Sequence, residues 1–533
     1  MPQPIELTLT TIAASGEAVG YLPGADWVRN PDQKGDARAV LVADAIPGER
    51  VLVEIVERED GWLYGRLLEI VEASPDRVTP PCPYFGPPAP VRLPDGSFLN
   101  PSGAPRCAGC LWQHIGYERQ LALKREIVVA QIASGMLEST AQKSRQAAEK
   151  LVEEVVALGD PHSPDGDAVL TFDFCTEMDF SLDKSGRLCL PERMGGLLAV
   201  EECLLHQPQL SQLFAAFAVD PETGAALAQE LTGVSLAVGG TGDELVDGQG
   251  GALVLESRRG DAPQLDLDLP VNVFLRRPAG DEIQADLLVG EWTHTAAAGA
   301  VTIAVYPPLG DRRLSWPHAL GNEAIPMIAG ALLAVQPFEY LADIWAGFGA
   351  NSVVLAEQCA TIVAVEDDPM AAAALQSNLA GLDSVDLLGG PPERVLTEMV
   401  EQNYRVHAAL LTPPAMADLL PLLPYLIRLG VSRLAVISDE SAELATSLAT
   451  IRAKGYALTT IQPVDLQPQQ ESVTLIARFD RLTDAVPVAA RPAPQSPPQS
   501  PTARPRRSAE PALPANSRRT RGTKKGSGKG RSR

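Results

Sequence analysis

The segment YLADIWAGFGANSVVLAE, residues 340–357, constrains the fold more than any other part of the sequence. An apolar strand pattern ends at Ile344, a turn with Gly347 and Gly349 follows, and a helix pattern begins directly after it. Glycines at such a turn let the backbone approach a ligand, and the start of the helix offers unpaired N–H groups. Because strand and helix patterns alternate from Tyr340 to Phe479, we predict βαβ units and a parallel sheet.

An acidic residue follows this turn at a spacing that suits the binding of an adenosine cofactor. Glu366 ends the next strand pattern, TIVAVE, where a carboxylate can accept hydrogen bonds from both ribose hydroxyls of an adenosine cofactor. A G-x-G pair alone is also compatible with an ordinary tight turn. The spacing of Asp343, Gly347, Gly349 and Glu366 within an alternating region favours a cofactor site.

The N-terminal part has a different period. Residues 5–73 alternate apolar and polar side chains in short runs separated by Gly and Pro, which predicts a small antiparallel barrel. A Pro-rich loop with one cysteine covers residues 74–106, and residues 117–132 have helical spacing. Residues 152–308 have a mixed, strand-rich pattern with many Gly-Asp turns, which predicts a separate central domain.

Charge is distributed unevenly along the chain. The formal net charge is -23, yet residues 485–533 contain twelve Lys and Arg and a single acid, Glu510. The rest is therefore more acidic than the whole chain and repels phosphate at long range. The Pro-rich, basic tail cannot bury a core, so we expect it to be disordered. It is either a solubilising tail or an arm that binds RNA backbone.

Neither a membrane span nor a secretory signal is expected. The longest apolar run, residues 325–350, is interrupted by a proline and by charged residues. Residues 1–9 lack a basic start and an apolar core. Seven cysteines in a chain of 533 residues do not form a disulfide scaffold, and they point to free thiols or a metal. We expect a soluble, cytoplasmic protein.

Four cysteines are candidate metal ligands. Cys107 and Cys110 form a C-x-x-C pair, with Cys82 before it and Cys203 after it. Thiolates so spaced bind a soft metal, either a structural zinc or an iron–sulfur cluster, and the spacing does not choose between them. The other three cysteines lie in apolar surroundings and are expected to be buried: Cys175, Cys189 and Cys359.

Three segments carry a family resemblance. AIPGERVLVEIVE, SPDRVTPPCPYFG and CAGCLWQHIGYERQLALKREIVV resemble the RNA (uracil-C5-)methyltransferases that carry an N-terminal TRAM domain. The resemblance implies an OB-like, RNA-binding barrel and a [4Fe–4S] cluster. Its ligands would be Cys82, Cys107, Cys110 and Cys203. Here residues 83–106 separate the first two of them, many more than the family usually has, and this insertion can loop out.

The glycine turn resembles the S-adenosylmethionine (SAM) loop of class I methyltransferases. The resemblance therefore covers nearly the whole chain up to about residue 481. It implies SAM as cofactor and gives a set of candidate SAM-binding residues: Asp343, Trp345, Gly347, Gly349, Glu366 and Thr412.

The family's chemistry is not matched in full. In the family a cysteine thiolate adds to uracil C6, C5 takes the SAM methyl, and a glutamate removes the C5 proton. The matching segment AVISDESAELATSL has Ser438 in the nucleophile position, while Glu471 stands at the position of the base. A serine hydroxyl is a weak nucleophile without a general base, and the neighbouring Asp439 and Glu440 disfavour an alkoxide.

Other family positions differ as well. In LLTPPAMADLL, Thr412 and Ala415 replace the acid and the arginine of an Asp-Pro-Pro-Arg motif, and Leu320 replaces a SAM-contacting glutamine. We interpret the uracil-C5 route as lost. Two alternatives follow: methyl transfer to a nitrogen or oxygen, which needs no covalent catalysis, and a non-catalytic RNA-binding protein such as a chaperone or assembly factor.

These patterns predict an α/β chain with structured RNA, rRNA or tRNA, as its partner. Its expected parts are a TRAM OB-like barrel (1–75), a cysteine loop (76–120), a strand-rich central domain (121–320), a Rossmann-type methyltransferase domain (321–481) and a disordered basic tail (482–533).

Overall fold

The computed structural model describes residues 3–22, 39–57, 63–136, 138–160, 168–217, 221–239, 250–258, 271–279, 282–298, 301–307 and 316–482. The chain divides into two compact units, residues 1–482 and 483–533. The predicted disordered tail lies outside the described residues. Within the described part, no helix is both long enough and apolar enough to cross a membrane.

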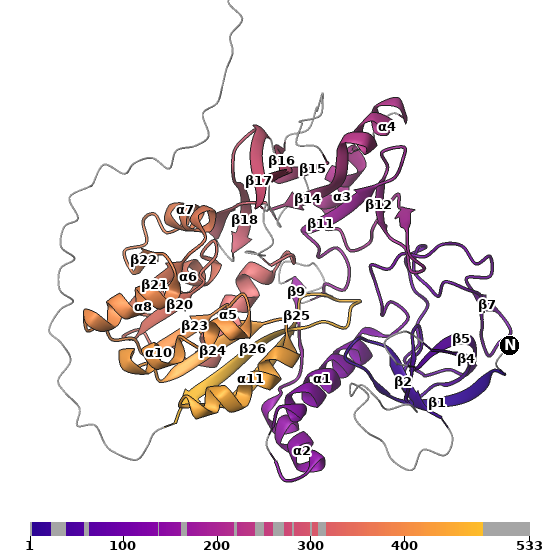
Figure 1. The fold of residues 1–533 in the computed structure, drawn as a ribbon, viewed down its shortest axis with the longest axis horizontal. Coiled ribbons are helices and arrows are strands. Elements are labelled where there is room, and N and C mark those ends of the chain that lie inside the picture. The colour runs from indigo at the N-terminus through magenta and orange to yellow at the C-terminus, as the bar shows by residue number, and fades with distance from the viewer. Residues whose placement is uncertain are drawn as a thin grey trace, which may run out of the picture. The chain divides into compact units, whose positions relative to one another are not determined.

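Five strands near the N-terminus form a closed barrel, as the alternating pattern predicts (Figure 1). Neighbouring strands are antiparallel in the order β3-β2-β1-β4-β5, and β3 pairs in parallel with β5 to close the sheet. Side chains such as Leu7, Val40 and Val53 point inward and form one core. The strands are β1 (Ile5–Ile12), β2 (Ala18–Tyr21), β3 (Ala39–Val42), β4 (Arg50–Glu57) and β5 (Leu63–Glu72).

The cysteine loop extends the barrel sheet. Two short strands, β6 (Val91–Arg92) and β7 (Phe98–Leu99), lie within the insertion between the first two candidate cysteine ligands. β6 pairs with the outer end of β5, so that the insertion is attached to the barrel.

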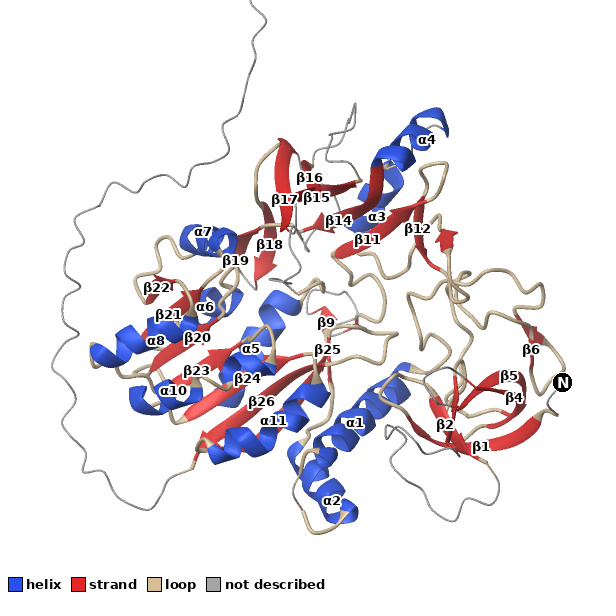
Figure 2. Ribbon diagram, viewed as in Figure 1, coloured by secondary structure: helices blue, strands red, loops and turns tan. Residues whose placement is uncertain are grey.

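A second sheet of seven strands occupies the middle of the chain (Figure 2). Its order is β13-β12-β11-β14-β15-β16-β17, and β15–β16 is its parallel pair. The helices α3 (Pro208–Ala216) and α4 (Pro221–Glu230) connect β13 to β14. The strands are β11 (Glu177–Leu182), β12 (Leu188–Pro191), β13 (Leu197–Ala199), β14 (Leu231–Val238), β15 (Gly251–Ser257), β16 (Asn272–Ala279) and β17 (Glu282–Val289).

Two small strand pairs are separate from this sheet. One is β9 (Gly159–Asp160) with β10 (Ala168–Val169). The other is the hairpin of β18 (His294–Ala298) and β19 (Val301–Val305), which packs against Phe348 of the glycine turn. The hairpin therefore borders the candidate cofactor turn.

The predicted parallel strands are present in the C-terminal part, but the sheet as a whole is mixed, because β26 is antiparallel to both β24 and β25. The strand order is β22-β21-β20-β23-β24-β26-β25-β8. Helices cover both faces: α5 and α6 on one, α8, α10 and α11 on the other. The strands are β20 (Tyr340–Ile344), β21 (Thr361–Glu366), β22 (Val385–Gly389), β23 (Ala408–Leu411), β24 (Arg433–Ser438), β25 (Tyr456–Asp465) and β26 (Thr474–Arg481). The helices are α5 (Gly321–Leu333), α6 (Ala350–Leu355), α7 (Pro369–Asn378), α8 (Pro392–Glu401), α9 (Met416–Leu419), α10 (Leu423–Leu429) and α11 (Ser441–Ala453).

The strand order reverses beside β20. The chain passes from β20 to β21 and β22 on one side and then returns to β23 on the other. Connections that leave in opposite directions open a crevice at the carboxyl ends of the two strands, where ligands bind in such sheets. The glycine turn follows β20 at this edge.

Residues 117–157 pack against or join this sheet, although the predicted boundaries place residues 117–120 in the cysteine loop and residues 121–157 in the central domain. The helices α1 (Tyr117–Ser134) and α2 (Ala141–Leu151) share a core with its strands, and β8 (Val156–Ala157) pairs with the end of β25. Sequence patterns do not reveal this because β8 is only two residues long and its partner lies about 300 residues away.

Candidate functional site

A cavity of about 480 Å³ opens at the reversal point of the parallel sheet. The turn after β20, the start of α6 and the segments after β23 and β24 form its wall, together with α5 and α11. The lining residues are Trp316, Asn322, Trp345, Ala346, Gly347, Ala350, Asn351, Thr412, Pro413, Pro414, Ala415, Ile437, Ser438, Asp439, Glu440 and Glu443.

The turn after β20 has an unusual backbone. Trp345, Gly347 and Gly349 have φ angles of 59°, 57° and 92°. Gly349 is the residue that caps α6, so its conformation directs the helix start toward the turn. The left-handed region is open to glycine at little cost and is disfavoured for other residues, which explains two of these positions.

Asp343 and Glu366 lie under the turn, fully buried, and are not among the lining residues of the cavity. Asp343 accepts hydrogen bonds from Ser352 Oγ (2.8 Å) and Asn351 Nδ2 (3.2 Å). Burial raises the pKa of Asp343 to about 6, and these two hydrogen bonds oppose the rise. Glu366 Oε2 accepts the N–H of Gly347 at 2.7 Å. Both carboxylates thus hold the turn in shape.

Of the predicted site residues, four line the cavity together: Trp345, Gly347, Thr412 and Ser438. They come from three different strand ends. The Oγ of Ser438 accepts the N–H of Glu440 at 3.1 Å. The side-chain oxygen of Thr412 is buried and has no hydrogen-bond partner.

Glu471, the predicted base, is not a lining residue of this cavity. It lies in the loop between β25 and β26, close to Gly16 of the barrel. Burial raises the pKa of Glu471, the charge of Lys124 lowers it, and the charge of Glu17 raises it. The loop therefore carries this carboxylate toward the barrel side of the structure.

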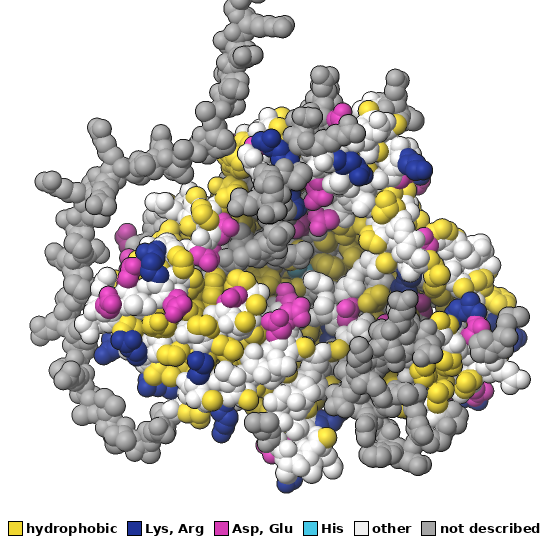
Figure 3. Space-filling model, in the orientation of Figure 1, with side chains coloured by type: hydrophobic (Ala, Val, Ile, Leu, Met, Phe, Trp, Pro, Cys, Tyr) yellow, Lys and Arg dark blue, Asp and Glu magenta, His cyan; other side chains and the backbone are white. Residues whose placement is uncertain are grey.

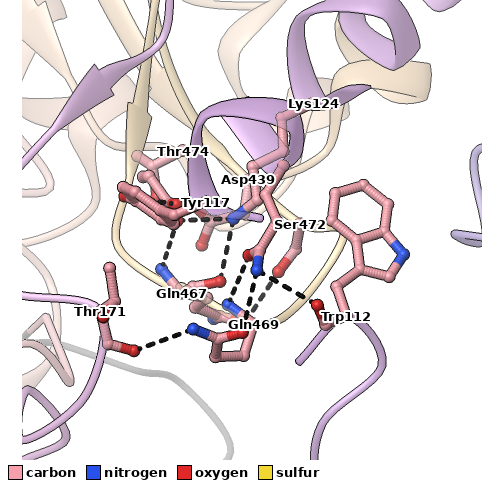
Figure 4. A network of polar contacts seen from close by, with 11 residues as sticks. Trp112, Tyr117, Lys124, Thr171, Asp439, Gln467, Gln469, Ser472 and Thr474 are labelled. Atoms are coloured by element: carbon pink, nitrogen blue, oxygen red, sulfur yellow. Dashed lines mark hydrogen bonds and ion pairs between the residues drawn. The ribbon is translucent and has the colours of Figure 1, made fainter. Parts of the chain in front are cut away.

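A polar network attaches that loop to α1 and to the cysteine loop (Figure 4). Lys124 Nζ lies 2.6 Å from Asp465 Oδ1 and 2.9 Å from the carbonyl of Gln467. The N–H groups of Leu111 and Trp112 both donate to the carbonyl of Gln469 at 3.0 Å. The position of the β25–β26 loop is thus fixed by residues that follow the C-x-x-C pair.

The four predicted metal-binding cysteines surround one cavity of about 200 Å³, whose other walls are mostly apolar. Burial raises the pKa of Cys110 to about 12 and that of Cys203 to about 11. The N–H of Gly109 points at the sulfur of Cys107 at 3.2 Å. In the described part of the chain, no three His, Cys, Asp or Glu side chains are close enough together to hold a single metal ion.

The remaining cysteines, Cys175, Cys189 and Cys359, are buried as expected. None of the seven cysteines forms a disulfide.

Most of the lining residues are absent from the sequence-based set, among them three with large or polar side chains: Trp316, Asn351 and Glu443. Asn351 is the second residue of the helix after the glycine turn, so its polar side chain at a helix start was an available signal. Glu443 lies in the first turn of α11. No sequence pattern marks Trp316 as a site residue, because only the packing of α5 brings its segment to the cavity.

A run of parallel strands whose order reverses beside a glycine turn is the arrangement of doubly wound α/β folds, and the cavity lies at the reversal point, where such folds bind their ligands. The solved structure of Pyrococcus abyssi tRNA (uracil-54, C5)-methyltransferase, in complex with S-adenosyl-L-homocysteine, matches with a TM-score of 0.59 and 14% identity. The match covers 89% of this chain and 99% of that one. The chain thus has the fold of this methyltransferase.

The sequence is also similar to curated proteins, although no protein-family model matches it. An uncharacterised RNA methyltransferase of Streptomyces avermitilis is 25% identical over 462 residues, which cover 83% of this chain and 93% of that relative. One from Listeria innocua is 23% identical over 504 residues, with 89% and 98% covered. The 23S rRNA (uracil(1939)-C(5))-methyltransferase RlmD of Alkalilimnicola ehrlichii is 24% identical over 507 residues, with 90% and 97% covered.

Proposed function

We propose that this chain binds SAM and acts on structured RNA, rRNA or tRNA, by methyl transfer to a base, and that the uracil-C5 route of its relatives has been lost. One observation carries the proposal: a single cavity joins the glycine turn to Ser438, which occupies the nucleophile position. The names of the relatives and the matched methyltransferase structure support the reaction class.

The residues of the cavity fit SAM. Asn351 Oδ1 and Thr412 Oγ1 are buried polar atoms without partners, ready to hydrogen-bond with a ligand. Gly347 lets the ligand approach the backbone, and the indole of Trp345 supplies an apolar surface. We propose that Asp343, Gly349 and Glu366, which do not line the cavity, contribute by holding the glycine turn in its conformation. SAM supplies an electrophilic methyl group on a sulfonium.

The proposed loss of the uracil-C5 route is supported by the surroundings of Ser438. Covalent catalysis on uracil requires a nucleophile with a base to activate it. No histidine is found among the described lining residues, and the adjacent charged side chains are the carboxylates of Asp439 and Glu440. Negative neighbours disfavour an alkoxide. Ser438 therefore cannot replace a thiolate at this position.

We further propose that Cys82, Cys107, Cys110 and Cys203 hold a [4Fe–4S] cluster. Each cysteine of such a cluster binds a different iron, so the ligands surround a volume, whereas zinc draws four sulfurs around one point. A cavity of about 200 Å³ lined by all four thiols fits the first arrangement.

Anaerobic purification tests the cluster. We expect a brown protein that contains iron, and the Cys110→Ser variant is expected to lose most of it, because one ligand is missing. Cys189→Ser is the matched control, since Cys189 is buried but is not a lining residue of the cysteine cavity. A wild-type protein that contains zinc and no iron would contradict the cluster and leave the fold untouched.

RNA binding is proposed for the barrel, in keeping with its five-stranded, OB-like form and with the TRAM resemblance. The basic tail, residues 485–533, is proposed to add affinity for the RNA backbone. The second candidate function, a non-catalytic RNA-binding protein, is favoured by the replacement of the nucleophile by Ser438. It predicts RNA binding without methyl transfer.

Calorimetric titration with SAM tests the proposed function, followed by transfer of labelled methyl groups to rRNA and tRNA. We expect SAM to bind and the wild type to leave uracil C5 unmodified. Ser438→Cys is a sharp discriminator: continued absence of 5-methyluridine supports a wider loss of the uracil site. A covalent adduct between the wild type and 5-fluorouracil-substituted RNA would overturn the proposal.

A further inference from the structure

A further cavity, of about 210 Å³, is lined by the turn after β3, the segment after β5 and the insertion of the cysteine loop. It borders the cysteine cavity, with which it shares Cys82 and Phe85, and it has no lining residue in common with the SAM-site cavity. Pockets for drug-sized ligands measure roughly 300–1,000 Å³, so this one suits a smaller group. The insertion supplies a large part of its wall: Phe85, Gly86, Pro87, Leu93, Leu99 and Asn100.

His114 is a buried lining residue with unused hydrogen-bonding groups. It is 3% exposed, and neither ring nitrogen has a hydrogen-bond partner among the described residues. Its ring stacks on Phe85, with centroids 5.7 Å apart and planes 24° apart. Burial lowers the pKa of His114 well below its usual value, the charge of Arg77 acts in the same direction, and the backbone of Ala45 opposes both. The ring is therefore neutral and offers one N–H donor and one nitrogen acceptor.

The charged groups at this cavity are already paired. Arg77 is the cationic side chain among the described lining residues, and it donates to both oxygens of Glu49, at 2.6 and 2.8 Å. The carboxylate of Asp44 accepts from Arg193 Nη1 at 2.6 Å. Neither a phosphate nor an ammonium group would find a free opposite charge here. The cavity therefore suits a neutral ligand with hydrogen-bonding groups.

A nucleobase meets these requirements. It is planar and neutral, and it carries donors and acceptors along its edges and an apolar face for packing. Pro80, Leu93 and Leu99 provide apolar walls. Val78 and Thr79 line the cavity and are exposed, so it can be reached from the surface. Hydrophobic side chains are also visible at the surface of the barrel region, on the right of the face drawn in Figure 3.

Resting on the proposed RNA function, we propose that this cavity receives one unpaired base of the bound RNA. The base passes Val78 and Thr79, exchanges hydrogen bonds with the ring of His114 and packs against the insertion. Its phosphates stay outside, which explains why the cavity needs no free cation. Proteins recognise RNA mainly through such unpaired bases. Because the SAM site is a separate cavity, this contact selects the RNA and leaves the base that is methylated free to enter that site.

Ultraviolet crosslinking of the full chain to rRNA and tRNA, followed by mass spectrometry of the peptides, locates the contact. We expect nucleotide adducts within residues 78–100 or at His114. RNA that binds but crosslinks only to other residues would overturn the inference. If the wild type binds neither RNA, the RNA partner of the proposed function is wrong as well.

The four ribonucleoside monophosphates are a second probe, which separates an RNA base from a free nucleotide. We expect them to bind far more weakly than RNA, because their phosphate finds no free cation at the cavity. A monophosphate that binds as tightly as RNA and displaces it would assign the cavity to a free nucleotide and overturn the inference.

The variant His114→Phe keeps a ring on Phe85 and removes both nitrogens. We expect RNA affinity to fall by about 10-fold, because the edge of the base loses its partner and stays out of water. Thermal unfolding is expected at the wild-type temperature or above it, since no unpaired nitrogens remain buried. His206→Phe is the matched control: His206 is 1% exposed, has an unpartnered Nδ1 and packs against Phe214, yet it does not line this cavity. Equal RNA affinity for the two folded variants would exclude His114 as a base contact.

Discussion

The variant Lys124→Met is expected to unfold more easily than the wild type by about 3–5 kcal/mol, since breaking a buried ion pair leaves an uncompensated charge. The side chains of Lys124 and Asp465 are both 0% exposed, and their charged atoms lie 2.6 Å apart. Without the ammonium group, Asp465 keeps only neutral donors, the hydroxyl of Tyr117 and the N–H of Gln467. Urea denaturation followed by circular dichroism measures the loss.

Two further variants make this prediction specific. Lys143→Met removes an exposed lysine from α2, and we expect a change within about 0.5 kcal/mol. The double variant Lys124→Met with Asp465→Asn removes both buried charges and is expected to recover part of the lost stability. If the double variant is no more stable than Lys124→Met alone, the unpaired carboxylate is not the cause.

The same pair illustrates what sequence patterns can and cannot predict. The glycine turn and the parallel sheet were predictable because glycine spacing and apolar periodicity are local signals. The contact of Lys124 with Asp465 joins residues 341 positions apart, and nothing local marks either as buried. The periodicity of α1 predicts a helix with charges on its outer face. Lys124 instead points inward, where its ammonium group donates to Asp465 Oδ1 and to the carbonyl of Gln467.

The residues of the candidate site also differ in whether local sequence patterns could predict their positions. Trp345, Gly347 and Thr412 directly follow parallel strands and Ser438 ends one, so their meeting at one edge of the sheet is a consequence of topology. Glu471 lies in a loop whose position depends on bonds to the cysteine loop, which periodicity cannot supply. The placement of that carboxylate therefore needed the three-dimensional structure.

Replacing Gly349 with alanine is expected to weaken SAM binding by about 10- to 100-fold, which corresponds to a loss of about 1.4–2.8 kcal/mol of binding free energy. The φ angle of 92° is strained for alanine. A Cβ at this position would also lie 2.4 Å from Cδ1 of Leu375, a fully buried side chain with little room to shift, so we expect the turn or α7 to move with it. Because Gly349 caps α6, that movement is transmitted to Gly347 and Asn351 at the cavity. Calorimetric titration with SAM measures the affinity.

Gly381→Ala separates the clash from the backbone strain. Gly381 has nearly the same φ angle, 89°, but an added Cβ would meet no atom within 4 Å. Both variants should therefore lose about 1–3 kcal/mol of stability through strain, while only Gly349→Ala loses SAM affinity. Adding Leu375→Val to Gly349→Ala removes the Cδ1 atom and should restore part of the binding, since valine has no atom at that position. If Gly381→Ala weakens SAM binding as much, general destabilisation explains the effect and the turn has no special role.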